Sequence, residues 1–190
     1  MVTSQAPKAR LDRDAWLAGA LELLREQGVD AVRVEPLSAR LGVTKGSFYW
    51  HFRNRQDLLA SLPAFWAERQ TAPVLAHADA TRGGPVDKLR AVAEYLGRED
   101  PDRYDNAMRA WAQFDPDVAA TVQAIDQRRI AFAAALFESV GLASEEAATR
   151  ARLFYFFDVG SQITGDAPAD EAARRRRSLR RVELLTTDLA

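Results

Sequence analysis

Residues 41–52 of this 190-residue chain read LGVTKGSFYWHF, and most of what the sequence predicts depends on them. A turn glycine and a helix-starting threonine lead into a short helix. At about 100° per residue, Phe48 and Phe52 fall on one face of that helix, whereas Trp50 lies nearly opposite. Aromatic residues at such spacing more often belong to a plain core. Here, however, Phe48, Tyr49, Trp50 and Phe52 span too wide an arc for one helix to bury, which favours an outward, DNA-reading face.

The residues before this helix complete a motif. Residues 33–41 predict a second short helix, and the Gly42-Val43-Thr44 link suits a helix-turn-helix, whose second helix enters the major groove of DNA. Gly46 and Ser47 place small groups on the same side as Trp50. The sequence therefore predicts a DNA-binding protein.

The stretch from residue 13 to residue 59 resembles the N-terminal DNA-binding domain of the TetR family of bacterial transcription regulators. The resemblance rests on a first helix AWLAGALELLREQG ending at Gly28, on VEPLSARLGVTKGSFYWHF, and on NRQDLL. The rest of the chain is similar to the family in layout. Arg33 stands where Thr is common at the start of the second helix, so phosphate would be met there by charge rather than by a hydroxyl. Ser38 and Arg55 stand where Ala and Lys are usual.

Charge is unevenly distributed in a way that suits DNA. The chain has a net charge of −1, but residues 1–60 carry nine Lys or Arg against seven Asp or Glu. Phosphate attraction needs a local basic surface rather than a basic protein. The predicted DNA-contacting residues are Arg33, Thr44, Lys45, Gly46, Ser47, Tyr49, Trp50, His51 and Arg55.

The pattern is helical almost throughout, without strand-like alternation, which predicts an all-α fold of about nine helices. We expect a helix-turn-helix DNA-binding domain over residues 1–53 and a helical effector-binding and dimerisation domain over residues 54–190. Side chains able to cap helices occur at Asp12, Asn54 and Asp115.

Several classes of protein are disfavoured. The absence of cysteine excludes disulfides and thiolate zinc sites, and the chain has only two histidines. No nucleophile with a nearby base, no Gly-rich phosphate loop and no metal-ligand spacing occurs, so we expect no enzyme, metal or cofactor. The first residues lack the apolar segment of a signal peptide, and the longest aromatic run is too short to cross a membrane. A soluble, cytoplasmic protein is expected.

The segment RARLFYFFDVGSQI, residues 150–163, carries more apolar surface than one helix of a small domain usually buries. A wholly intrachain core is one explanation, and a subunit interface is the favoured one. The resemblance implies a homodimer in which the last two helices pair across a two-fold axis. The predicted interface residues are Phe154, Tyr155, Phe157, Ser161, Val182 and Leu185.

Large apolar side chains also occur through the predicted fourth to seventh helices, where such a set is more often plain core. The resemblance implies that this region encloses a small-molecule site, for which an apolar pocket with a few polar groups would fit. The candidate ligand-binding residues are Phe65, Trp66, Tyr104, Met108, Trp111 and Phe114.

With the resemblance, the sequence predicts a homodimeric transcription regulator. We expect a repressor that a small, largely apolar ligand releases from a palindromic double-stranded DNA operator. The alternative is a DNA-binding regulator without a small-molecule effector, controlled by a protein partner or by its own abundance.

Overall fold

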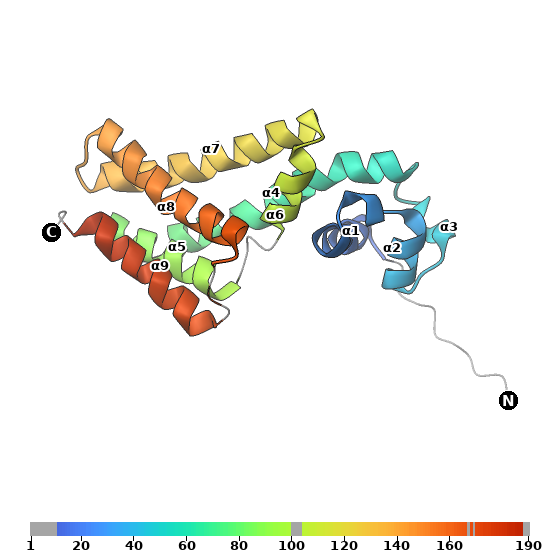
Figure 1. The fold of residues 1–190 in the computed structure, drawn as a ribbon, viewed down its shortest axis with the longest axis horizontal. Helices are drawn as coiled ribbons and strands as arrows, with labels where there is room; N and C mark the ends of the chain where they lie inside the picture. Colours follow the sequence, from blue (N-terminus) through green and yellow to red (C-terminus); the bar gives the residue numbers. More distant parts are fainter. Residues whose placement is uncertain (1–10, 100–103, 167, 169, 188–190) are drawn as a thin grey trace. The chain divides into compact units, whose positions relative to one another are not determined.

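The computed structural model describes residues 11–99, 104–166, 168 and 170–187, and this part of the chain is helical, without strands (Figure 1). The all-α prediction is therefore confirmed. In chain order the elements are α1 (Arg13–Gln27), the 3-10 turn η1 (Val29–Ala31), α2 (Val34–Leu41), α3 (Lys45–Phe48), α4 (Arg55–Ala80), α5 (Pro85–Glu99), α6 (Asp105–Ala112), α7 (Pro116–Ser139), α8 (Ser144–Thr164) and α9 (Glu171–Thr186).

Capping side chains explain where several helices begin. The Asp12 carboxylate accepts from the backbone N–H of Ala15 at 2.7 Å, and Asn54 Oδ1 accepts from Asp57 N–H at 2.9 Å. Asp115 caps α7 in the same way, and the proline that follows it occupies the first turn. The caps predicted at Asp12, Asn54 and Asp115 are confirmed.

The first of two compact units, residues 1–65, has an aromatic centre. Trp16 of α1 packs edge-on against Phe48 of α3, with ring centroids 5.4 Å apart, and Phe48 stacks on Phe52 at 5.3 Å. All three side chains are buried. A Cβ on Gly19 would lie only 3.0 Å from a methyl group of Leu41, so the missing side chain lets α1 and α2 pack closely.

The boundary between the units falls within α4, whereas the sequence prediction placed it before that helix, between residues 53 and 54. Side chains on the first part of α4 belong to the core of the first unit, since Leu58 and Leu62 are fully buried. Arg13 also donates to Ser61 Oγ at 2.6 Å, which joins α1 to this part of α4.

The second unit, residues 66–190, pairs its helices around a separate core. Helix α5 packs against α9, and α7 packs against α8 and α6 (Figure 1). Phe137 of α7, Leu89 of α5, Phe154 of α8 and Val182 of α9 are buried members of one apolar cluster. The helix pairs leave an internal cavity, described below.

Candidate nucleic-acid interface and internal cavity

The turn between α2 and α3 has helix-turn-helix geometry. Gly42 ends α2 with φ of +65°, a left-handed conformation that glycine adopts without steric cost. The N–H of Val43 then donates to the carbonyl of Ser38 at 3.0 Å, which closes the end of the helix. Thr44 begins α3 in extended backbone geometry, but its side chain makes no capping bond, so the hydroxyl is not used within the helix.

The two aromatic faces around α3 lie as the helical phasing predicts. Phe48 and Phe52 are buried, whereas Tyr49 is 61% exposed and Trp50 is 75% exposed. The Tyr49 ring packs edge-on against the Phe48 ring, with centroids 5.3 Å apart, so Tyr49 contacts the core although most of its surface is exposed. The exposed Trp50 therefore lies in the chain between two residues, Phe48 and Phe52, that are buried in the aromatic core.

Trp50 forms part of a shallow surface hollow together with Thr44, Gly46 and Ser47. Packing within the chain does not require glycine at position 46, since the nearest atom to an added Cβ would be Thr44 Oγ1 at 3.8 Å. The small groups instead leave the surface beside Trp50 open to a close approach from outside.

The predicted cationic contacts occupy different environments. Arg33 is exposed at the start of α2, where its side chain forms no cap. Lys45 Nζ is exposed and lies 2.7 Å from the carboxylate of Glu35 on α2. His51 is half-buried, and its Nε2 atom is buried without a hydrogen-bond partner among the described residues.

Arg55 has a structural role that the sequence analysis did not predict. Its Nε donates to the carbonyl of Val32 at 2.6 Å, and its Nη2 donates to the carbonyl of Val29 at 2.8 Å. The guanidinium therefore joins the start of α4 to the segment that leads into α2. Arg55 was predicted to contact phosphate directly. Its guanidinium already donates to two backbone carbonyls, so a phosphate would have to compete with them or use the remaining N–H groups.

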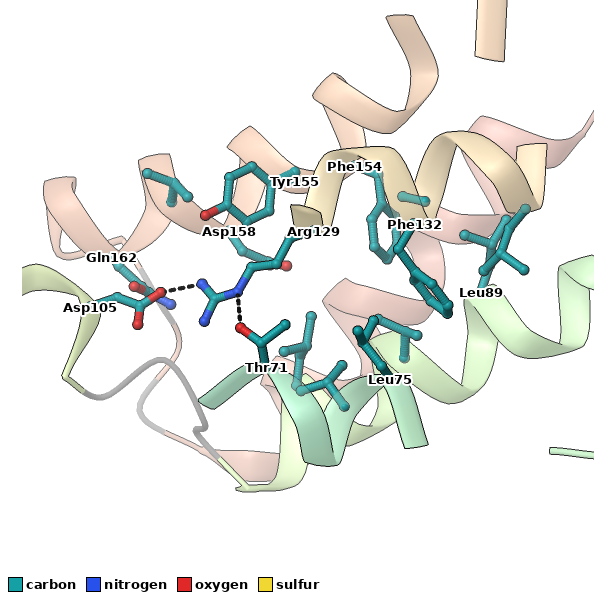
Figure 2. A pocket seen from close by; sticks show the side chains of 16 residues that line it. Thr71, Leu75, Leu89, Asp105, Arg129, Phe132, Phe154, Tyr155, Asp158 and Gln162 are labelled. Carbon is teal, nitrogen blue, oxygen red and sulfur yellow. Dashed lines mark hydrogen bonds and ion pairs between the residues drawn. The ribbon is translucent and has the colours of Figure 1, made fainter. Parts of the chain in front are cut away.

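The second unit contains an internal cavity of about 50 Å³ lined by residues of α4 to α8 (Figure 2). Most of its wall is apolar. Figure 2 shows Leu75, Leu89 and Phe132 gathered toward one end, and Asp105 and Gln162 at the other. An apolar chamber with a few polar groups at one end has the usual chemistry of a small-molecule site.

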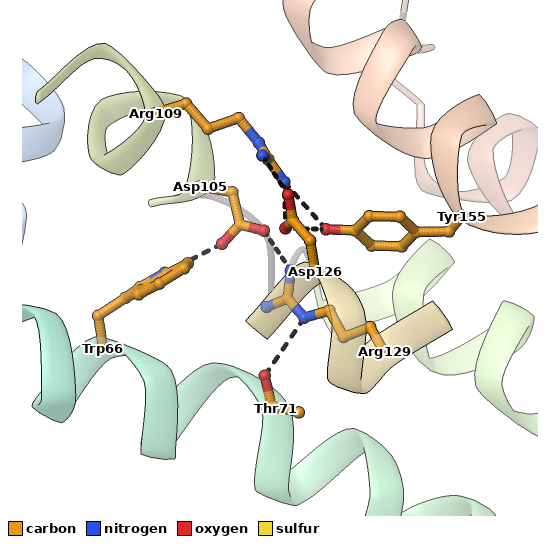
Figure 3. A network of polar contacts seen from close by, with 7 residues as sticks. All are labelled: Trp66, Thr71, Asp105, Arg109, Asp126, Arg129 and Tyr155. Atoms are coloured by element: carbon orange, nitrogen blue, oxygen red, sulfur yellow. Dashed lines mark hydrogen bonds and ion pairs between the residues drawn. The ribbon is translucent and has the colours of Figure 1, made fainter. Parts of the chain in front are cut away.

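A buried ion pair stands at the polar end. Arg129 of α7 donates to Asp105 of α6 and, through Nε, to Thr71 Oγ1 of α4 at 3.2 Å. Asp105 also accepts from the indole Nε1 of Trp66 at 3.0 Å (Figure 3). This network links α4, α6 and α7 at the wall of the cavity.

A second network lies beside the first (Figure 3). Both terminal nitrogens of Arg109 donate to Asp126 at 2.8 Å, and the Tyr155 hydroxyl donates to the same carboxylate at 2.6 Å. The Asp126 hydrogen bonds raise the pKa of Arg109, and burial raises the pKa of Tyr155. Tyr155 therefore presents a neutral phenol to the cavity.

The residues predicted for ligand binding do not line this cavity. Trp66, Tyr104, Met108 and Trp111 are buried as core side chains, and Phe65 is buried in the first unit. Phe114 is 87% exposed at the end of α6. Trp66 touches the polar end of the site through its bond to Asp105. The lining residues of α7 and α8 were missed, although a charged residue within an apolar helix, such as Arg129, is a usable signal.

The six predicted interface residues divide between the surface and the interior. Phe154 and Val182 are buried within the chain, so neither side chain is free to meet a partner, and Phe154 and Tyr155 line the cavity. Phe157 is 41% exposed, and Ser161 and Leu185 are half-buried. Further exposed apolar side chains on α8 and α9 are Leu153, Phe156, Ile163 and Leu184.

Among the described residues, no group of His, Cys, Asp or Glu side chains is arranged to hold a metal ion. None of the helices described is long and apolar enough to cross a membrane.

Residues 17–62 match the family model described as bacterial regulatory proteins, tetR family. Curated relatives include the class G tetracycline repressor protein of Vibrio anguillarum, 43% identical over 63 residues, which are 33% of this chain and 30% of the relative. The class A tetracycline repressor protein from transposon 1721 of Escherichia coli is 36% identical over 88 residues, which are 46% and 41% of the two chains. The chain thus spans less than half the length of these two relatives.

Solved structures share the fold over nearly the whole chain. A TetR-family transcriptional regulator from Streptomyces coelicolor has a TM-score of 0.74 at 20% identity, covering 94% of this chain and 90% of that one. SmeT, the repressor of the Stenotrophomonas maltophilia multidrug efflux pump SmeDEF, has a TM-score of 0.64 at 20% identity with the same coverage.

The fold and the N-terminal motif define an all-helical protein with a helix-turn-helix domain. Residues 17–62 are thus similar to the N-terminal domain of TetR-family regulatory proteins, and the chain as a whole shares the fold of solved TetR-family structures.

Proposed function

We propose that the protein is a DNA-binding transcription regulator that acts in the cytoplasm as a homodimer on a palindromic operator, and that it is a repressor. The observation that carries the proposal is the exposed Trp50 above the buried Phe48 and Phe52. An indole held open to solvent on a rigid core contributes little to folding. It is well placed to meet the sugar-phosphate edge or a thymine methyl group.

The residues around Trp50 would make the DNA contacts. Gly46 and Ser47 let α3 approach the bases closely, and the unused hydroxyl of Thr44 has a donor for a phosphate oxygen. Lys45 and Tyr49 would contact backbone oxygens from either side. The remaining members of the predicted surface are Arg33, His51 and Arg55. Arg33 would meet phosphate by charge. The main role of Arg55 is structural, through its hydrogen bonds to the carbonyls of Val29 and Val32.

A homodimer would place two such surfaces on one operator. Support comes from the apolar side chains that α8 and α9 expose, Phe156, Phe157 and Leu184 among them. Phe154 and Val182, which the sequence placed in the interface, are buried within the chain. The proposed interface therefore uses the exposed side chains instead.

The cavity in the second unit is the proposed effector site, and its wall is chiefly apolar. A small, largely apolar ligand bound there would release the protein from DNA. Because ligand and operator would oppose each other, each must weaken the other's binding by the same factor. Control by a protein partner or by abundance, without an effector, is the second candidate, and the presence of a cavity with a polar end favours the first.

The test of DNA binding is selection of bound sequences from a random double-stranded DNA library by the full chain. We expect a palindromic sequence to be enriched. Trp50→Ala should weaken binding to it by about 1–3 kcal/mol while changing the free energy of unfolding by less than about 0.5 kcal/mol. Phe114→Ala is the matched control, since it removes another exposed aromatic ring, from the second unit, and should leave binding unchanged.

Absence of any enriched sequence would exclude the proposed activity. A large loss of folding stability in Trp50→Ala, with the DNA affinity of the folded fraction intact, would instead exclude Trp50 from the DNA-contacting surface. For the effector, ligands that raise the melting temperature should also weaken DNA binding.

A further inference from the structure

Among the described residues, three charged side chains belong to the cavity wall: Asp105, Arg129 and Asp158. Asp105 and Arg129 form the buried ion pair described above, with side chains only 3% and 12% exposed. Each therefore already has an opposite charge in contact, and the wall gains no net charge from them.

Asp158 pairs with a cation that is not itself part of the described cavity wall. It forms an ion pair with Arg181 of α9, whose side chain is 5% exposed and lies over the Phe154 ring at 4.3 Å. Tyr155 also lines the cavity and is uncharged, and its neighbours Arg109 and Asp126 pair with each other. Each charged side chain described in the wall thus has an opposite charge in contact.

The apolar wall has a consequence for charged ligands, because it offers few polar groups to replace the water around an ion. An ion that entered would lose water from its hydration shell, and the charged side chains described in the wall are already in contact with an opposite charge. Burying an ion under such conditions costs several kcal/mol.

We propose that the cavity selects an electrically neutral molecule, with an apolar body and one hydrogen-bonding group, over anionic or cationic ligands of the same shape. The apolar body lies between Leu75, Leu89 and Phe132, and the polar group lies against Asp105, Arg129 and Gln162 (Figure 2). Neutral alcohols, amides and ketones have this chemistry. The inference rests on the proposed effector site and names the class of ligand that it takes.

Four ligands with one eight-carbon chain test the charge preference: 1-octanol, octanamide, octanoate and octylamine. At pH 7 the last two are an anion and a cation. Isothermal titration calorimetry with the full chain should give dissociation constants for 1-octanol and octanamide that are about tenfold or more below those of both ions. Octanoate or octylamine binding as tightly as 1-octanol would overturn the inference, and so would the absence of binding by all four.

Variants of the wall provide a second, independent measurement. Asp105→Asn removes one negative charge from the contact with Arg129 and makes the polar end more positive, so octanoate should gain about tenfold relative to 1-octanol. Glu94→Gln removes the same charge from an ion pair with Arg175 that lies outside the cavity wall, and should leave the preference unchanged. An unchanged preference in a folded Asp105→Asn protein would place the polar group of the ligand elsewhere.

The double variant Asp105→Asn, Arg129→Gln covers the case in which the single variant does not fold. It removes both charges together, so the wall stays neutral and the preference for 1-octanol should return. A preference for octanoate in the double variant would contradict the charge argument. Failure of the regulatory function is distinguishable from all of these outcomes, because a neutral ligand would then bind with the expected preference and leave DNA affinity unchanged.

Discussion

Lys45 at the start of α3 donates to the carboxylate of Glu35 on α2, with 2.7 Å between Nζ and Oε1. The hydrogen bond and charge of Lys45 hold the pKa of Glu35 below its ordinary value, so Glu35 is an anion at neutral pH. A cation predicted to meet DNA phosphate is therefore occupied, before DNA arrives, by a carboxylate on the neighbouring helix.

We expect Glu35→Gln to strengthen binding to all DNA sequences by about twofold to fivefold at low salt, because Lys45 is released and a negative charge near the phosphates is removed. Lys45→Ala should weaken binding to all sequences and reduce the salt slope by about one unit. Fluorescence anisotropy over a salt series measures both. Glu22→Gln, which removes a carboxylate paired with Arg25 on α1, is the control. A salt slope unchanged in Lys45→Ala would remove this residue from the contacts.

Arg55 allows a test of stability that does not depend on DNA. Arg55→Lys should destabilise the protein by about 1–2 kcal/mol, since an ammonium cannot reproduce the fork that serves the carbonyls of Val29 and Val32 together. Arg53→Lys, at an exposed side chain that pairs with Asp57 at 3.5 Å, should change stability by less than about 0.5 kcal/mol. Urea unfolding of both variants decides the matter, and equal effects would mean that the two bonds of Arg55 contribute nothing.

Assembly can be tested at Phe157, the exposed member of the predicted interface set. Phe157→Glu should leave the chain folded, because the guanidinium groups of Arg177 and Arg181 lie 4.9 and 5.3 Å from the ring and can pair with the new carboxylate. The same change should convert the proposed dimer to a monomer in analytical ultracentrifugation, because it places a charge in an apolar contact. Phe114→Glu should remain dimeric. A Phe157→Glu protein that sediments as a dimer would exclude this face from the interface.

Tyr155 makes stability depend on alkaline pH. Burial raises its pKa in the folded protein above the ordinary value of about 10, so the folded state holds the phenolic proton more tightly than the unfolded state. This contribution is complete below pH 10 and is lost as the pH rises further, by up to about 1.4 kcal/mol per pH unit. Tyr155→Phe lacks the ionisable group. We therefore expect the stability difference between wild type and Tyr155→Phe, measured by urea unfolding between pH 9 and 11, to favour wild type less as the pH rises.

The features that sequence could predict are those set within a few residues. Asp12, Asn54 and Asp115 cap helices through bonds that span two or three positions, and the opposite faces of Phe48 and Trp50 follow from helical geometry alone. The cavity depends instead on which helices meet in space. Nothing in the spacing of Asp105 and Arg129 indicates that their side chains touch.

Helical periodicity also could not separate the three kinds of aromatic residue in the second unit. Phe132 and Phe154 line the cavity, Trp111 is core, and Phe114 is exposed just beyond the end of its helix. The sequence pattern of a core-facing helix and that of a cavity-lining helix are alike, because both positions are filled by apolar side chains. Only the charged residues within the stripe distinguish the wall of a cavity.

The bonds from Arg55 to the carbonyls of Val29 and Val32 have a mechanical consequence for the first unit. They fasten the opening turn of α4 to the short segment from which α2 emerges, so a displacement at that turn pulls on α2 directly and not through a flexible loop. Since Gly42 and Val43 join α2 tightly to α3, both helices should be carried along as one rigid body. A displacement that arrives along α4 would then turn the exposed indole of Trp50 without unfolding the helices beneath it.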